Sequence, residues 1–275
     1  MNIGIIGLGV VGEATNDYFL DKCINVIGYD KYKKIGNIEN TLSCEIIFLC
    51  LPTPFDIKIK KYDKSSIHEV CKFYSKNKYK GLIVLKSTVE PETTENLYKK
   101  YKINIVHNPE FLTAKTAKED VRNQGHIVIG IPNNIDYDIL VDKLKHFYNT
   151  YNPDAEISLI KSNESELMKL SVNSFYAVKI QFFNEIYLLC NNLDISYNIV
   201  KKTMLKNNWI NKMHTNVPGT DGKLSYGGMC FPKDTNALNE YLSYKKLPNK
   251  IIDATIKERN KMRNVMNNPI KIKNT

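Results

Sequence analysis

The sequence predicts an α/β protein in which a doubly wound parallel sheet is followed by a smaller all-helical domain. Over the first 160 residues, short runs rich in Ile, Val and Leu alternate with helical segments, and a glycine-rich turn follows the first run. Beyond residue 160 the strand-like runs stop and long helical patterns begin. A chain of 275 residues also exceeds the usual size of one domain, so a division into two is natural.

The first strand is predicted over residues 2–6, and a glycine-rich turn leads from it into a helix over residues 13–20. In this turn Gly7 makes the tight bend, Gly9 lets the backbone approach a pyrophosphate, and Gly12 lets the helix pack closely on the strand. The order of strand, glycines and helix is typical of a Rossmann-type dinucleotide site. The expected cofactor contacts of the turn are Gly7, Gly9, Val10, Val11 and Gly12.

A second strand over residues 25–29 ends at Asp30, which follows Gly12 by 18 residues. A carboxylate at this position can accept hydrogen bonds from the adenosine ribose and repels a 2′-phosphate, so it favours NAD over NADP. Lys31 and Lys33 weaken this preference without reversing it. The alternative is an ordinary loop in which Asp30 only caps a turn.

The remaining strands of the sheet are predicted at residues 45–50, 81–85, 103–106 and 126–131, with crossover helices over 65–76 and 93–102. Continuous apolar runs of this kind are typical of strands that are buried on both faces. Polar residues follow three of these strands, at the edge where ligands bind in such sheets. They are found at residues 52–54, 86–88 and 108–111.

From Ser162 the pattern changes to a capped start and then to a helix without Pro or Gly that runs from Leu167 to Ile186 or beyond. Apolar residues occupy nearly all of its circumference, which indicates a buried or interface helix. Lys169 and Asn173 are four residues apart, so they project from one face. A buried lysine needs a partner or a task, and pairing with a carboxylate is the structural alternative to a functional role.

Residues 227–234 read Gly-Gly-Met-Cys-Phe-Pro-Lys-Asp and give Cys230 the surroundings of a nucleophile. The two glycines permit close approach, and Pro232 with Lys233 marks the first turn of a helix whose N-terminus favours a thiolate. The alternative is a small buried hydrophobe, the commoner role of a lone cysteine.

The composition limits the classes of protein to consider. The six cysteines show no spacing typical of metal ligands or disulfides, so we expect reduced thiols, no metal and a cytoplasmic location. No apolar run is long enough for a membrane span, and the N-terminal run belongs to the nucleotide turn, so neither anchor nor signal peptide is expected. Half of the net charge of +10 lies in residues 257–275, interpreted as a solvated basic tail, and no nucleic-acid motif accompanies it.

Six motifs occur in the order and approximate spacing of the UDP-glucose/GDP-mannose 6-dehydrogenases, and the chain resembles that family from residue 1 to about 260. They are residues 7–12, 52–54, 86–89 and 108–112, Lys169 and Asn173 with Asn184 and Glu185, and residues 227–234. The resemblance implies two successive oxidations of a sugar C6 hydroxyl to a carboxylate, with NAD as cofactor and a nucleotide sugar, first of all a UDP-sugar, as substrate.

The resemblance also implies an organisation into domains and an oligomeric state. Residues 1–160 would form the NAD-binding domain, 161–260 a helical catalytic and dimerisation domain, and 261–275 the basic tail. The helix over residues 161–190 would hold a homodimer together.

The resemblance assigns a role to each matching residue. Cys230 would trap the aldehyde as a thiohemiacetal, and a second oxidation would give a thioester. Lys169 and Asn173 would stabilise alkoxide and oxyanion species, and Asp234 would organise the water that hydrolyses the thioester. The active-site contacts beside nicotinamide and sugar would be Thr88 and Glu110. Further cofactor contacts would be Pro52, Thr53, Ser87 and Lys233, and a further substrate contact would be Gly227. Independently of the resemblance, the charge of Lys223 makes it a candidate substrate contact for the diphosphate.

Three features depart from the family pattern. Ala114 stands where a second glutamate is common, and Trp209 stands where an arginine often reaches the sugar of a neighbouring subunit. The sequence also ends at Thr275, whereas family members usually continue into a further nucleotide-binding domain, so it would be a short form. These departures keep open a catalytically impaired NAD-binding or interaction subunit. The third alternative is a β-hydroxyacid dehydrogenase of similar architecture, but those enzymes need no thiolate such as Cys230.

Overall fold

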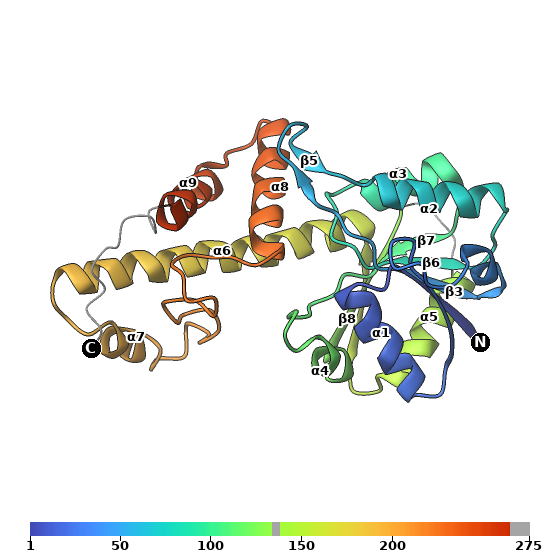
Figure 1. Ribbon diagram of the computed structural model, residues 1–275, viewed down its shortest axis with the longest axis horizontal. Coiled ribbons are helices and arrows are strands. Elements are labelled where there is room, and N and C mark those ends of the chain that lie inside the picture. Colours follow the sequence, from blue (N-terminus) through green and yellow to red (C-terminus); the bar gives the residue numbers. More distant parts are fainter. Residues whose placement is uncertain (134–137, 265–275) are drawn as a thin grey trace. The chain divides into compact units, whose positions relative to one another are not determined.

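The computed structural model of the protein describes residues 1–133 and 138–264 (Figure 1). Its backbone contacts divide the chain into two compact units. The sheet unit comprises Met1–Pro54 and Tyr62–Lys169, and the helical unit comprises Phe55–Lys61 and the described residues from Leu170 onward.

Within the described residues, a seven-stranded sheet with the order β2-β1-β3-β6-β7-β8-β9 forms the centre of the sheet unit. Its strands are β1 (Asn2–Ile6), β2 (Asn25–Tyr29), β3 (Ile46–Leu49), β6 (Leu82–Leu85), β7 (Ile105–His107), β8 (His126–Ile131) and β9 (Glu156–Lys161). Neighbouring strands pair in parallel except β7 and β8, which are antiparallel where His107 pairs with Gly130. The predicted fold class is confirmed, with one antiparallel pairing and one edge strand, β9, that the prediction does not contain.

Helices cover both faces of this sheet, which explains why its strands are continuously apolar. Alternate residues of a strand enter different buried clusters: Ile46 and Phe48 pack in one, Ile47 and Leu49 in the other. The first cluster includes residues of α1 (Val10–Asp21), α4 (Ala117–Arg122) and α5 (Asp138–Tyr151), and the second includes residues of α2 (Ser65–Lys76) and α3 (Thr93–Tyr101). The short 3₁₀ helix η1 (Ile38–Ser43) precedes β3.

The helical unit contains most of α6 (Ser162–Asn192), together with α7 (Tyr197–Met204), α8 (Cys230–Tyr244) and α9 (Lys250–Asn264). The small hairpin of β4 (Phe55–Asp56) and β5 (Lys61–Tyr62) also contributes to this unit, although it comes from the first quarter of the chain. The two units divide inside α6, between Lys169 and Leu170. No helix in the described ranges is both long and apolar enough to cross a membrane.

Glu166 ties the first turns of α6 to α3 inside the sheet unit. One oxygen of its carboxylate accepts hydrogen bonds from the Thr94 N–H at 2.7 Å and from the Thr94 hydroxyl at 2.6 Å. Its side chain is 0% exposed, and this burial raises the pKa of Glu166 to about 7 although the Thr94 donors oppose the rise. The carboxylate therefore caps the N-terminus of α3 from a neighbouring helix.

The sequence predicts a buried or interface helix here, because apolar residues occupy nearly all of the circumference of α6. The structure shows a different distribution of polar and apolar side chains on this helix. Its buried positions include the polar residues Glu166, Lys169, Asn173, Gln181 and Asn184, whereas several large apolar side chains on the same helix are exposed. Other elements supply hydrogen-bond partners to Glu166, Asn173, Gln181 and Asn184 and a carboxylate partner to Lys169.

The structure corrects part of the interpretation of residues 257–275 as a solvated basic tail. Residues 257–264 belong to α9, and Arg259 and Arg263 on that helix donate hydrogen bonds to backbone carbonyls of residues 225 and 226. The interpretation was wrong for these two arginines because their partners are distant in sequence, whereas Lys257 and Lys261 are exposed. Residues 265–275 lie outside the described part of the chain.

Candidate active site

The glycine turn lies between β1 and α1, and its geometry leaves room for an anion. Gly7 has a φ of +88°, and a Cβ atom there would come within 2.6 Å of the Cys50 carbonyl oxygen. A Cβ atom on Gly12 would lie 1.8 Å from the Gly7 carbonyl oxygen. At Gly9, in contrast, it would meet no atom within 4 Å, so open space adjoins the N-terminus of α1. A helix N-terminus with such an opening fits the pyrophosphate of a dinucleotide.

Asp30 is held in place at the end of β2. One carboxylate oxygen accepts a hydrogen bond from the Leu8 N–H at 2.8 Å, and the other accepts from Tyr32 N–H at 2.9 Å and Lys33 N–H at 2.8 Å. Burial acts to raise the pKa of Asp30, but the backbone donors outweigh it and hold the pKa below its usual value. Asp30 therefore caps a turn and also presents a fixed carboxylate, because each oxygen can accept more than one hydrogen bond.

The two lysines beside Asp30 are paired with other acids. Lys31 forms an ion pair with Glu69 at 2.7 Å. Lys33 pairs with Glu13 and donates a hydrogen bond to the Leu8 carbonyl at 2.6 Å. Since both charges have carboxylate partners, they oppose the preference for NAD less than the sequence indicates.

The loops that follow β3 and β6 are joined by side-chain hydrogen bonds at the carboxyl edge of the sheet. The Thr53 hydroxyl donates to the Thr88 carbonyl at 2.8 Å. The Ser87 hydroxyl donates to the Leu51 carbonyl at 2.7 Å and accepts from the Leu51 N–H at 3.1 Å. Thr53, Ser87 and Thr88 are buried, whereas Pro52 in the same loop is exposed. The structure thus brings these predicted cofactor contacts together.

Lys169 and Glu110 form a buried pair in the sheet unit. The Lys169 Nζ lies 4.0 Å from a Glu110 carboxylate oxygen, and the two side chains are only 5% and 13% exposed. The same Nζ lies 4.8 Å from the centre of the Phe111 ring. The other Glu110 oxygen accepts from the Leu112 N–H at 2.5 Å. Lys169 therefore has the carboxylate partner that its burial requires, but at a distance that leaves it able to donate to a substrate oxygen.

Lys86 is a further charged group, which the sequence analysis places in a motif at the ligand-binding edge without giving it a role. Its Nζ donates to the Asn108 side-chain oxygen at 3.0 Å, and the Tyr148 hydroxyl donates to the same oxygen at 2.5 Å. Burial lowers the pKa of Lys86, and the charge of Glu110 acts against this. The signal in the sequence was a lysine placed directly after a buried strand, where a charge is costly without a partner.

In the helical unit, Cys230 is the first residue of α8 and its side chain is exposed. Asp234, one turn along the same helix, is completely buried. Its carboxylate accepts from the Asn173 side-chain N–H at 2.6 Å and also pairs with Lys233. The arrangement places a thiol where the helix N-terminus favours a thiolate, with a fixed carboxylate one turn away.

The loop before Cys230 is held by α6. Ser225 donates its N–H to the Asn184 side-chain oxygen at 2.8 Å and its hydroxyl to the Gln181 side-chain oxygen at 2.6 Å. Asn184, which the sequence motif grouped with Lys169 and Asn173, therefore positions this loop rather than a substrate.

Other predicted positions in the helical unit lie on this loop or close to it. Lys223 is exposed in a turn that a hydrogen bond from Gly219 N–H to its carbonyl closes at 3.0 Å. Gly228 has a φ of +72°, and Gly227 precedes it. Trp209 is 87% exposed.

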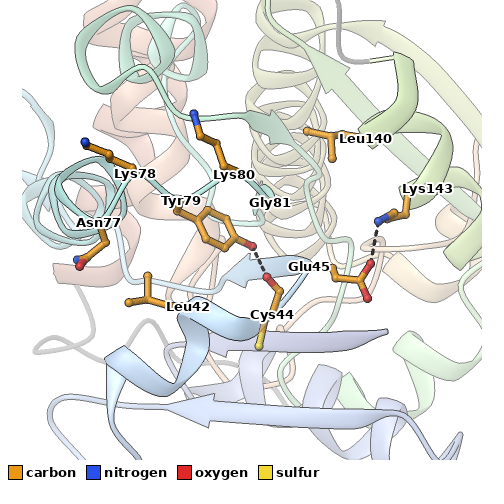
Figure 2. Close-up of a pocket in the computed structure, with 10 residues that line it drawn as sticks. All are labelled: Leu42, Cys44, Glu45, Asn77, Lys78, Tyr79, Lys80, Gly81, Leu140 and Lys143. Carbon is orange, nitrogen blue, oxygen red and sulfur yellow. Dashed lines mark hydrogen bonds and ion pairs between the residues drawn. The ribbon is translucent and has the colours of Figure 1, made fainter.

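A cavity of about 430 Å³ lies at the opposite, amino edge of the sheet (Figure 2). Cys44 and Glu45 before β3 and residues 79–81 before β6 line it. The Tyr79 hydroxyl donates to the Cys44 carbonyl at 3.0 Å, and Lys143 pairs with Glu45 at 2.7 Å. Burial raises the pKa of the Cys44 thiol to about 11, so this cysteine is no nucleophile. The cavity contains none of the predicted site residues.

Two family models match the chain. Residues 36–152 match the NAD binding domain of the UDP-glucose/GDP-mannose dehydrogenase family, and residues 163–261 match its central domain. A UDP-glucose 6-dehydrogenase of Rickettsia bellii is 32% identical over 226 residues, which are 80% of this chain and 50% of the relative. One of Rickettsia typhi is 34% identical over 267 residues, or 91% and 56%. The chain spans about half the length of the curated relatives it matches.

Solved structures share the fold. A UDP-glucose dehydrogenase of the archaeon Pyrobaculum islandicum superposes with a TM-score of 0.84 at 24% identity, covering 96% of this chain and 68% of that chain. A 3-hydroxyisobutyrate dehydrogenase of Mycobacterium tuberculosis superposes with a TM-score of 0.69 at 15% identity, covering 94% and 92%. At these identities the likeness concerns the fold alone.

Proposed function

Because the chain belongs to the UDP-glucose/GDP-mannose dehydrogenase family, we propose that it is an NAD-dependent nucleotide-sugar 6-dehydrogenase acting on a UDP-sugar. The observation that carries the proposal is the surroundings of Cys230. The Cys230 thiol is exposed at the N-terminus of α8. The carboxylate of Asp234, one turn along the helix, is buried and accepts a hydrogen bond from the Asn173 side chain. A β-hydroxyacid dehydrogenase needs no such thiol.

The proposed cofactor site is built from the glycine turn and the carboxyl edge of the sheet. The N-terminus of α1 beside Gly9 would hold the pyrophosphate, and Asp30 would accept hydrogen bonds from the adenosine ribose. Residues of the two loops joined by Thr53 and Ser87 would line the nicotinamide side, together with Thr88. NAD supplies the hydride acceptor for each of the two oxidations.

In the first oxidation the C6 hydroxyl loses its proton and C6 loses a hydride, which leaves an aldehyde. The Lys169 ammonium and the Asn173 amide are suited to stabilise the alkoxide, because both carry N–H donors and lie one turn apart on α6. Ala114 cannot take the proton, so we assign that role to Glu110, to Asp234 or to a water molecule.

Cys230 then forms a bond from its sulfur to the aldehyde carbon, and the oxygen takes the electron pair and a proton to give a thiohemiacetal. Loss of a second hydride and of the hydroxyl proton converts this adduct to a thioester. Water attacks the thioester carbon, the C–S bond breaks, and the products are the sugar carboxylate and the restored thiol. The fixed carboxylate of Asp234 would orient that water.

We also propose a homodimer that forms through α6. Phe175, Phe182 and Leu189 recur every seven residues on this helix and are 63%, 48% and 51% exposed. A heptad-spaced apolar stripe supports helix-to-helix packing, and a second copy of the same helix would cover it. A cytoplasmic location remains a prediction from the cysteine pattern.

A substrate panel tests the proposed function. UDP-glucose, UDP-N-acetylglucosamine, UDP-galactose and GDP-mannose are each mixed with enzyme and NAD, and NADH absorbance is followed to completion. We expect two NADH per molecule of one UDP-sugar. Binding of NAD without NADH formation from any sugar nucleotide would instead indicate the impaired subunit that Ala114 keeps open. Turnover of a small β-hydroxyacid alone would favour the third alternative.

A further inference from the structure

The loop over residues 219–228 closely precedes Cys230. Hydrogen bonds from α9 hold this loop in addition to those that Gln181 and Asn184 of α6 accept. This part of the chain has no strand or helix of its own. Its backbone therefore depends on side chains from other elements for its conformation.

Two arginines of α9 supply these contacts. The Arg263 Nη1 lies 2.8 Å from an Asp221 carboxylate oxygen, and its Nη2 donates to the Ser225 carbonyl at 2.9 Å. The Arg259 Nε donates to the Tyr226 carbonyl at 3.2 Å, and its guanidinium lies 5.6 Å from the Tyr226 ring centre. The Arg263 side chain is only 15% exposed, whereas its partner Asp221 is 41% exposed.

The Arg263 guanidinium also packs against Gly227. A Cβ atom on Gly227 would come within 2.6 Å of Arg263 Nη2 and 2.7 Å of Nη1. One side chain thus contacts the loop at residues 221, 225 and 227. The planar fork of an arginine can hold a carboxylate and a carbonyl at the same time, whereas the single ammonium of a lysine cannot reproduce that geometry.

We propose that Arg263, assisted by Arg259, is a positioning residue that holds this loop in the conformation from which Cys230 reacts. The proposal deepens the proposed function and rests on it where turnover is concerned. Arg263 acts through the loop, so its loss should alter how the sugar nucleotide binds more than how NAD binds.

The first test compares Arg263→Lys with the control Lys261→Gln. Lys261 is exposed on the same helix and pairs with Glu258. Amide hydrogen exchange is measured by mass spectrometry on peptides that cover residues 219–229. We expect exchange about tenfold faster in Arg263→Lys and unchanged in the control. Exchange at the wild-type rate in Arg263→Lys would overturn the proposal.

The second test is a double-mutant cycle that needs no catalytic activity. Gly227→Ala should lower the melting temperature in the wild-type background, because the new methyl group meets the Arg263 guanidinium. In the Arg263→Ala background the same change should have a clearly smaller effect. Equal shifts in the two backgrounds would show that Arg263 does not pack on Gly227 and would contradict the proposal.

Enzyme kinetics then test whether the contacts between Arg263 and the loop matter for the reaction. With a sugar nucleotide that the wild type oxidises, Arg263→Lys should raise KM about tenfold and leave the Kd of NAD unchanged. Asp221→Asn, which removes the ion pair alone, should give a smaller change in the same direction. Unchanged KM in both variants would refute the positioning role. A wild type that oxidises no sugar nucleotide would refute the proposed function. Hydrogen exchange and the double-mutant cycle would still test whether Arg263 holds the loop.

Discussion

The cysteines of this chain occupy two kinds of environment. Burial raises the pKa of the Cys44 thiol to about 11 and those of Cys50 and Cys71 to about 12. Cys230, in contrast, is exposed at the start of α8, where backbone N–H groups favour a negative charge. The same residue type is therefore a small hydrophobe at Cys44, Cys50 and Cys71 and a candidate nucleophile at Cys230.

Replacing Cys230 by serine tests this assignment. We expect Cys230→Ser to lower the rate of acid formation at least about a thousandfold, because an alkoxide is hard to form and an ester is not the thioester that the second oxidation requires. NAD binding, followed by titration, should be unchanged. The matched control is Cys23→Ser, a second exposed cysteine, which should keep full activity. Acid production by Cys230→Ser at the wild-type rate would remove Cys230 from the mechanism.

The raised pKa of Glu166 predicts how the stability of the protein depends on pH. Its folded-state pKa, about 7, lies above the usual 4.5, so protonated Glu166 favours the folded protein. This contribution is fully present below pH 4.5 and is lost as pH rises through 7. Between pH 5 and 7.5 the loss amounts to about 2 kcal/mol in the free energy of unfolding. Urea unfolding at the two pH values should show this decline in the wild type and not in Glu166→Gln, and equal declines would contradict it.

At the scale of the element, the exposed stripe on α6 predicts the oligomeric state. Phe182→Glu places a charge in the middle of the stripe, so we expect it to shift a dimer to a monomer in light scattering at micromolar concentration. Ile139→Glu is the matched control, because Ile139 is an exposed apolar residue of the sheet unit and should leave the mass unchanged. A wild type that is monomeric under these conditions would rule out the α6 interface.

How far the sequence predicted each element depends on whether the signal is local. Strand β3 (residues 46–49) and helix α2 (residues 65–76) were predictable because the spacing of their apolar residues reflects which side chains are buried. The edge strand β9 mixes polar and apolar residues with an exposed face, so it resembles a loop. The antiparallel pairing of β7 and β8 depends on the path of the chain, which composition does not encode.

The same distinction applies to the candidate site. The spacing of Lys169 and Asn173 predicted a shared helix face, because helical periodicity is local. The bond from Asn173 to Asp234 joins positions 61 residues apart, and Arg263 contacts loop residues that lie 38 and 42 positions away. No periodicity in one sequence reports such pairings, so they appear only once the chain is folded.

At the scale of the whole molecule, the net charge of +10 should favour anionic substrates. We expect the KM for the sugar nucleotide to rise severalfold between about 20 and 300 mM salt, because the screening length falls from about 20 Å to below 10 Å. Sodium chloride and choline chloride at equal ionic strength should act alike, since the effect is one of screening. A KM that does not depend on salt would mean that local contacts alone provide the binding energy.

The continuity of α6 has a consequence for which changes of sequence the protein tolerates. Lys169 belongs to one compact unit and Asn173 to the other, but both residues lie on the same helix, α6. Each residue of an α-helix advances the direction of its side chain by about 100°, so one residue inserted between them would turn Asn173 away from the Lys169 face. The four intervening steps of α6 therefore fix the angular phase between these two side chains. Substitutions on its exposed side leave that phase intact, whereas a single insertion or deletion would destroy it.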